Sequence, residues 1–407
     1  MKPAYATETI RVATSPKSTV GILVAMPDDW NGRFVGVGSG GEGGVLDIRS
    51  LEPYLSQGYA AAMTDLGTAP NAIRTGFANP EVWRDFGHRA THAMTIAAKD
   101  CIARHYGRPP RFSYFSGAST GGQQAFSEAQ RHPEDYDAIL AGVPAHCRAR
   151  LHAYFLWNWQ HLRTPDGGRL FSHDQERSCH RACLEAFADM ESFPGARMRF
   201  VSTPRWTPDA IERAIGIAAR ADPSLGAPHI DALRALYSGP RHRATGEKIF
   251  DGIPPAGDFA KAARNLYLFN WIFGEETDYS RIDFGKSIDL YLARLSPDLD
   301  AEDTNLSAFE SAGGKMIVYA GTQDSIVPCG ATLDYFGRLA RLRGSAAAAR
   351  RFFRLFILPG REHFGGPGIQ ELRRPLAALR RWREKGVEPN MEGVSCTEHR
   401  IVPLEPV

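Results

Sequence analysis

The sequence has few cysteines and no long apolar run, and each of these absences excludes a class of protein. Six cysteines in 407 residues are too few and too scattered for a disulfide framework. No stretch approaches the roughly 20 apolar residues of a membrane-spanning helix. Residues 1–13 contain no apolar core of a signal peptide. We therefore expect a cytoplasmic protein with no membrane partner.

A strong charge of either sign is also missing. The formal net charge is +2 at pH 7, with 23% charged and 43% hydrophobic residues. This balance gives no basis for binding nucleic acid or an anionic membrane surface. The expected partner is a small molecule, and the sequence makes no prediction of oligomeric state.

Patterns that bind metals or nucleotides are sparse as well. Cys179 and Cys183 lie one helical turn apart with His180 between them, but no second ligand pair follows at the spacing of a zinc site. The glycine-rich residues 38–44 are not followed by the lysine of a P-loop, nor by the acidic residue of a dinucleotide fingerprint. We therefore predict neither a metal nor a cofactor.

Short apolar runs rich in β-branched residues alternate with glycine-rich or helical segments in the first 145 residues and the last hundred. This alternation predicts a mostly parallel sheet covered by helices. Ala90, Met94, Ala97 and Cys101 share one face of a predicted helix that ends at Gly107. The predicted strands cover residues 19–26, 33–37, 59–64, 112–115, 138–143, 315–320 and 353–358.

The strand pattern is interrupted in the middle of the chain. Residues 146–309 contain many aromatic residues, prolines and scattered charges without clear strand periodicity. A chain of 407 residues also exceeds the size at which one hydrophobic core usually stops growing. We predict an α/β core formed by residues 1–145 and 310–407, with an inserted lid domain over residues 146–309.

Residues 117–121 read Gly-Ala-Ser-Thr-Gly, the pattern G-x-S-x-G, between an apolar strand and a helix-like stretch. In that context the serine lies on a strained strand-to-helix turn and its hydroxyl acts as a nucleophile. The helix N-terminus behind it favours developing negative charge. A glycine-rich turn with a capping serine is the alternative interpretation. We predict that Ser119 is the nucleophile of a hydrolase.

A serine hydroxyl needs a base, and hydrolases with this motif supply it in the chain order serine, carboxylate, histidine. Asp324 is the first aspartate after the strand predicted at 315–320, and His363 is the first histidine after the strand predicted at 353–358. Functional loops of open α/β sheets lie at the carboxyl ends of strands. We therefore predict a triad of Ser119, Asp324 and His363.

Other residues compete for these roles. Asp65 and Glu362 are alternative carboxylates, and His146, His152 and His161 are alternative bases in or near the insertion. Asp65 precedes the nucleophile in the chain, so we favour a structural role for it as a cap of its loop.

A tetrahedral intermediate needs two backbone N–H donors for its oxyanion. One donor comes from the residue after the nucleophile, which is Thr120. The other is expected from the glycine-rich loop 38–44, where we select Gly41 and keep Gly40 as the alternative.

Several separate stretches together resemble the tannase and feruloyl esterase family. They are residues 36–44, 58–67, 114–144, 237–257, 298–324 and 353–366. The resemblance implies an α/β-hydrolase core with a lid and hydrolysis of esters of aromatic acids, such as gallate, ferulate or terephthalate monoesters. It also implies the same three triad residues.

The sequence departs from this family at three places, one of which is the aspartate loop, where it reads Ala-Gly-Thr-Gln-Asp and the family often has a His-Gly-Trp or similar start. The other two concern a disulfide and a calcium loop. Family members typically join a cysteine before the nucleophile to one after the histidine in a disulfide, but Ala118 and Phe364 occupy these positions. The calcium loop of the lid has no counterpart, because residues 186–199 offer too few oxygen ligands. Both departures fit a reducing cytoplasm.

The leading functional prediction is a serine carboxylic-ester hydrolase that forms an acyl-enzyme. Trp157, Trp159, Trp271 and Phe273 are the candidates for lining the substrate pocket. Acyl transfer, lactone opening or carbon–carbon bond hydrolysis at the same site is the alternative reaction. A non-catalytic binding protein on a hydrolase scaffold is the alternative class.

Overall fold

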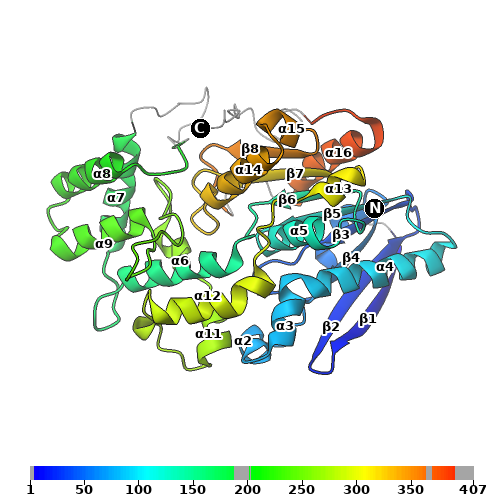
Figure 1. Ribbon diagram of the computed structural model, residues 1–407, viewed down its shortest axis with the longest axis horizontal. Helices are drawn as coiled ribbons and strands as arrows, with labels where there is room; N and C mark the ends of the chain where they lie inside the picture. The colour runs from blue at the N-terminus through cyan, green and yellow to red at the C-terminus, as the bar shows by residue number, and fades with distance from the viewer. Residues whose placement is uncertain (1–3, 188–200, 202, 364–368, 390–407) are drawn as a thin grey trace.

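The computed structural model describes residues 4–187, 201, 203–363 and 369–389 (Figure 1). Its centre is an eight-stranded sheet with the order β1-β2-β4-β3-β5-β6-β7-β8. Strands β1, β2 and β4 pair antiparallel, and every later pair is parallel. The mostly parallel sheet predicted from the sequence is therefore confirmed. The strands are β1 (Tyr5–Ser15), β2 (Ser18–Pro27), β3 (Arg33–Val37), β4 (Ala60–Thr64), β5 (Phe112–Ala118), β6 (Ala138–Gly142), β7 (Lys315–Gly321) and β8 (Phe353–Leu358).

Helices cover both faces of the sheet, and the side-chain alternation within the strands shows why. In β2, Ile22 and Val24 belong to one buried cluster, while Leu23 and Ala25 belong to another on the opposite face. The helices are α1 (Glu52–Leu55), α2 (Ala72–Gly76), α3 (Pro80–Arg84), α4 (Ala90–Tyr106), α5 (Thr120–Arg131), α6 (Arg148–His161), α7 (His173–Ala186), α8 (Pro208–Ala221), α9 (Ala227–Ser238), α10 (Phe259–Ala262), α11 (Tyr267–Phe273), α12 (Lys286–Leu299), α13 (Ser307–Ser311), α14 (Gly330–Leu342), α15 (Ala346–Arg350) and α16 (Ile369–Lys385). Ile48–Ser50 and Tyr279–Arg281 are short 3₁₀ helices, and Asp85–Arg89 is a π-helical segment between α3 and α4.

The two faces carry different helices. Helices α4 and α5 contribute Met94 and Phe126 to the larger cluster, and α1 and α16 contribute Leu55 and Leu379 to the smaller one. Helix α4 ends at Gly107, whose φ of +70° is the left-handed conformation of a helix C-terminus, as its sequence predicted. The sheet is thus a buried central layer, which fits its continuous apolar strands.

Strand β1 was not predicted from the sequence. It lies at the edge of the sheet and pairs with β2 alone, and its burial pattern shows no fully buried position. Ile10 and Val12 are its half-buried side chains against the core. An edge strand with so little apolar surface gives only a weak alternation signal.

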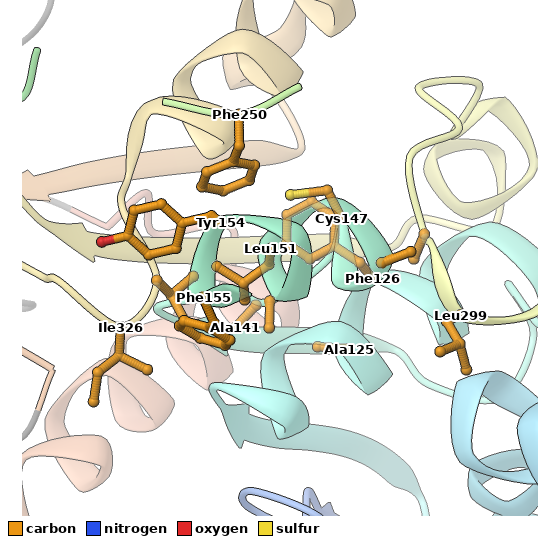
Figure 2. Packing of buried hydrophobic residues seen from close by; sticks show 14 of the residues in the cluster. Ala125, Phe126, Ala141, Cys147, Leu151, Tyr154, Phe155, Phe250, Leu299 and Ile326 are labelled. Atoms are coloured by element: carbon orange, nitrogen blue, oxygen red, sulfur yellow. The ribbon is translucent and has the colours of Figure 1, made fainter. Parts of the chain in front are cut away.

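The described residues between β6 and β7 form helices α6 to α13 and no strand of the central sheet. Helices α7, α8 and α9 lie to one side of the sheet in Figure 1. Helix α6 joins this helical segment to the core, because Leu151 and Phe155 pack in one cluster with Phe126 of α5 and Ala141 of β6 (Figure 2). Among the described residues, no helix has the length and apolarity needed to cross a bilayer.

Asp300 follows α12 and lies at the start of α6, where its Oδ1 accepts a hydrogen bond of 2.8 Å from the Ala149 N–H. Burial raises the pKa of Asp300 to about 7, although the Ala149 hydrogen bond opposes this effect. The ionised carboxylate is therefore disfavoured in the folded protein. The raised pKa means that protonated Asp300 favours the folded state. This contribution to the free energy of unfolding is complete below about pH 4 and is lost as the pH rises through 7.

We expect Asp300→Asn to remove this pH dependence, because asparagine keeps the acceptor oxygen and cannot ionise. Between pH 5 and pH 8 the wild type should lose stability relative to the variant by at most about 3 kcal/mol, because the loss of about 1.4 kcal/mol per pH unit ends near the folded pKa of about 7. Urea unfolding of both proteins at the two pH values measures the difference. Parallel pH profiles for the two proteins would show that Asp300 titrates normally.

Candidate active site

Three loops at the carboxyl ends of parallel strands carry the predicted triad. Ser119 directly follows β5, Asp324 follows β7, and His363 follows β8. Strands β5, β6, β7 and β8 are successive neighbours in the sheet. The loops therefore gather at one edge, as expected for sites of open α/β sheets.

Ser119 occupies a strained turn between β5 and α5. Its φ of +61° and ψ of −116° are rare for a residue with a side chain. Three backbone hydrogen bonds hold it there: its N–H donates to Gly142 O at 2.9 Å, and its carbonyl accepts from Gln123 and Ala145 at 3.1 Å each. This is the geometry that exposes the hydroxyl of a nucleophile at a strand-to-helix turn.

Glycines are required around this turn because backbones touch there. A Cβ at Gly38 would lie 2.6 Å from the Cα of Gly121, and a Cβ at Gly117 would lie 2.4 Å from the Gly121 carbonyl oxygen. The glycine-rich loop after β3 thus packs directly against the nucleophile turn. These two close contacts explain why the first and last positions of the G-x-S-x-G motif, Gly117 and Gly121, have no side chain.

Asp324 and His363 form a direct pair. The Nδ1 of His363 lies 2.7 Å from Oδ2 of Asp324, and the two side chains are 4% and 0% exposed. The second carboxylate oxygen accepts from the N–H groups of Ile326 and Val327 at 2.9 and 2.8 Å. Both oxygens are therefore fixed, and the pairing keeps a proton on Nδ1 of His363. Its Nε2 is then the basic nitrogen.

The two loops that carry this pair are joined by close contacts. A Cβ at Gly321 would lie 2.2 Å from the carbonyl oxygen of Arg361. The Gly360 N–H donates to Thr322 Oγ1 at 2.8 Å, and the Gln323 N–H donates to Arg361 O at 3.1 Å. Hydrogen bonds and backbone packing therefore set the position of His363 relative to Asp324.

The structure describes only part of the regions where the family has its disulfide and its calcium loop. Ala118 ends β5, but Phe364 lies outside the described residues. Most of the segment at 186–199, where the sequence lacks a calcium loop, lies outside them as well.

The predicted oxyanion donors lie side by side. The Thr120 hydroxyl donates a hydrogen bond of 2.6 Å to the Gly41 carbonyl oxygen. Gly41 has a φ of +58°, and a Cβ built on either Gly40 or Gly41 meets nothing within 4 Å. The backbone N–H of Thr120 lies in the first turn of α5, where helix donors have no partner within the helix.

Arg148 is a residue of this site that the sequence did not single out. It is 3% exposed at the start of α6, and its guanidinium donates to Thr120 Oγ1 at 3.0 Å and to Gly41 O at 3.1 Å. It also donates to the Tyr267 hydroxyl at 2.7 Å and lies over the ring of Phe86. The sequence feature that could have pointed to Arg148 is its position at the start of the first helix after β6. Its residue type alone does not distinguish it from the other lysines and arginines, of which the chain has 48 in all.

The alternative carboxylates have other partners. The Oδ1 of Asp65 accepts from the N–H groups of Gly21 and Gly67 at 2.9 Å each, which is the structural role favoured for it. Glu362 forms an ion pair with Lys261.

The alternative histidines lie within the helical packing. His146 and His152 are fully buried, and the Nδ1 of His161 lies 2.8 Å from the backbone carbonyl oxygen of Trp157. Burial lowers the pKa of His146 to about 4, which makes it a weak base at neutral pH. Cys183 is buried with its sulfur 3.2 Å from the Tyr237 hydroxyl.

The aromatic candidates for the substrate pocket are placed differently from one another. Trp271 is fully buried, donates to Ala72 O and packs in the core, so it offers no surface to a substrate. Trp157 and Trp159 are half-buried in α6, about 14 and 17 Å along the helix from Arg148. Phe273 ends α11 and is half-buried.

Comparisons with known proteins show which family the chain belongs to. The family model of tannase and feruloyl esterase matches residues 4–282 and 276–400. The chain belongs to this family. An uncharacterized esterase of Xanthomonas campestris is 27% identical over 91% of this chain and 74% of its own length. Feruloyl esterase B of Aspergillus niger is 26% identical over 94% of this chain and 77% of its own length.

Solved structures share the fold of this family member. The crystal structure of an esterase from Aspergillus oryzae superposes with a TM-score of 0.82 at 21% identity, over 95% of this chain and 81% of the other. Tannin acyl hydrolase from Aspergillus niger superposes with a TM-score of 0.72 at 18% identity, over 95% and 83%. The α/β-hydrolase fold is therefore confirmed, and membership of the family makes the chain a carboxylic-ester hydrolase.

We expect Arg148→Met to lower kcat about 10- to 100-fold while KM changes less than about threefold, because Arg148 holds the loop of Gly41 and not the substrate. Steady-state kinetics on a soluble aryl ester measure both constants. Arg148→Lys should recover part of the loss. Arg150→Met is the matched control, since Arg150 lies on the same helix and pairs with Glu302. An unchanged kcat in Arg148→Met at a normal melting temperature would contradict the positioning role.

Proposed function

We propose that the chain is a serine esterase that hydrolyses esters of phenolic aromatic acids through an acyl-enzyme. Ser119 is the nucleophile, His363 the base and Asp324 the carboxylate that orients the base. The observation that carries the proposal is the 2.7 Å pair of His363 and Asp324, at the same sheet edge as the strained Ser119. The family and its named feruloyl esterases support the substrate class.

In the proposed reaction, Nε2 of His363 takes the Ser119 hydroxyl proton as the oxygen attacks the ester carbonyl. The resulting oxyanion accepts hydrogen bonds from the N–H groups of Thr120 and Gly41. Collapse of this intermediate breaks the ester bond, and His363 returns the proton to the leaving alcohol. Water activated by His363 then attacks the acyl-enzyme and releases the acid and free Ser119.

Asp324 supports this cycle without changing its own protonation. Its carboxylate lies beside Nδ1, so it stabilises the imidazolium that forms when His363 accepts the proton. Its other oxygen is held by two backbone N–H groups, which keeps the imidazole in one orientation.

We infer that residues 146–309 act as a lid over this site. They connect β6 to β7, and so they leave the sheet between the strand of the nucleophile and the strand of the acid. Helix α6 begins at the oxyanion loop through Arg148, and Tyr154 of the same helix donates to the backbone of Ser325 beside Asp324. One element of the segment thus contacts both sides of the site.

We expect Ser119→Ala to lower kcat at least about 10³-fold with the fold intact, because it removes the attacking oxygen. His363→Ala should lose as much, and Asp324→Asn as much or less. Hydrolysis of a nitrophenyl ester and thermal melting measure activity and folding together.

Asp65→Asn is the control for the carboxylate, because Asp65 also follows a strand but its Oδ1 accepts from the backbone N–H groups of Gly21 and Gly67. Folded Asp65→Asn should keep most of its kcat. A larger loss per folded molecule than in Asp324→Asn would identify Asp65 as the acid.

We expect methyl gallate or methyl hydroxycinnamates to be turned over with a higher kcat/KM than methyl esters of alkyl acids. Acid quenching during turnover should trap the acyl group on Ser119, detectable by peptide mass spectrometry. An added alcohol should divert part of the product to a new ester, since water and the alcohol compete for the acyl group of the same acyl-enzyme. If the alcohol adduct dominates in water, the chain is an acyltransferase; if neither acid nor adduct forms, the proposed reaction is wrong.

A further inference from the structure

Two histidines and an aspartate gather at the end of α5 that is opposite to Ser119. His92 lies in α4, His132 is the residue that ends α5, and Asp135 lies in the turn before β6. One ligand atom from each lies within 4.8 Å of the other two. The Nδ1 of His92 is 2.6 Å from Oδ2 of Asp135, and the rings of His92 and His132 stack with centroids 3.7 Å apart.

A fourth ionisable group lies beneath this cluster. Glu128 is fully buried next to Asp135, and burial together with the Asp135 carboxylate raises the pKa of Glu128. Among the described residues, neither of its carboxyl oxygens has a hydrogen bond of good geometry. It lies one helical turn before His132, on the same face of α5. A buried carboxyl without donors is unfavourable, and a bound cation would satisfy it.

We propose that His92, His132 and Asp135 bind a divalent transition-metal ion such as Zn²⁺, with Glu128 as a further oxygen ligand or as the acceptor for a metal-bound water. Imidazole nitrogen and carboxylate oxygen are ligands that Zn²⁺ uses in proteins. Ligand atoms about 2.1 Å from a tetrahedral ion lie about 3.4 Å apart. Binding would therefore separate the His92 Nδ1 from the Asp135 Oδ2, now 2.6 Å apart, and would turn the two stacked imidazole rings toward the ion. Co²⁺, Ni²⁺ and Cu²⁺ suit the same donors.

Among the described residues, no lysine or arginine side chain pairs with the carboxylate of Asp135, whose ion-pair partner is His92. The ammonium group of Lys99 donates to the backbone carbonyl oxygen of Asp135 and not to its carboxylate. The Asp135 side chain is 8% exposed and that of His92 is 29% exposed, so the ion has a path from solvent to a largely enclosed carboxylate.

The ion would serve structure and not the ester chemistry. Helix α5 has 12 residues, so His132 lies about 18 Å along the helix from Ser119. Binding would tie α4 to the turn between α5 and β6. No metal was predicted from the sequence, and these three residues were not among the candidates. Their spacings match no common motif, and it is the packing of α4 on α5 that brings them together.

The test is a titration of chelator-treated protein with Zn²⁺ by calorimetry, and with Co²⁺ by visible absorption. Wild type should bind one more equivalent than His132→Ala and Asp135→Asn, or should bind at least about tenfold more tightly. His105→Ala is the matched control, because His105 is exposed on the same helix α4 and contacts Tyr106. It should bind like wild type.

Two further readouts separate this site from the catalytic histidine and from misfolding. His363→Ala should keep the extra equivalent, and Zn²⁺ should raise the melting temperature of wild type and His105→Ala but not of His132→Ala. Melting in chelator gives the baseline of each variant. If His132→Ala and Asp135→Asn bind Zn²⁺ with the stoichiometry and affinity of wild type, or if wild type binds none, the proposal is wrong.

Discussion

The contact between the backbones of Gly38 and Gly121 is the constraint on which the rest of the site depends. A side chain at either position would push the glycine-rich loop away from the nucleophile turn, since a Cβ at Gly38 would lie only 2.6 Å from the Gly121 Cα. This approach allows the Gly41 carbonyl to reach both the Thr120 hydroxyl and Arg148. The geometry of the proposed oxyanion hole therefore follows from glycines that themselves take no part in the chemistry.

The proposed site has one fixed charge of each sign, a carboxylate beside the imidazole and a guanidinium near the proposed oxyanion donors. Asp324 lies beside His363, where in the proposed reaction it would stabilise positive charge on the imidazole, whereas the buried guanidinium of Arg148 donates to Thr120, a proposed oxyanion donor. The carboxylate and the guanidinium do not pair with each other, and Arg148 forms no ion pair among the described residues. A fixed positive group near developing negative charge is effective where water is excluded, because it needs no reorganisation during the reaction.

Much of this arrangement could be predicted because it depends on chain order and local pattern. Parallel strands place the loops of Ser119, Asp324 and His363 at one edge, so the first suitable residue after each strand could be selected. Arg148 and the cluster around His132 could not, because their roles arise from contacts between distant segments. Trp271 shows the same limit, since an aromatic residue type does not reveal whether its ring faces a pocket or the core.

Helix α5 links Ser119, the proposed nucleophile, to the rest of the core along most of its length. Its residues from Thr120 to Ala129 are all buried. Gln124 accepts from the Ser39 N–H of the glycine-rich loop at 2.9 Å and donates to Thr91 of α4 at 2.8 Å, so one side chain joins three segments. A nucleophile must be held within a fraction of an ångström to react efficiently. Restraint of α5 against α4, by Gln124 near Ser119 and by the proposed metal ligands at the far end, therefore acts on the position of the reacting oxygen itself.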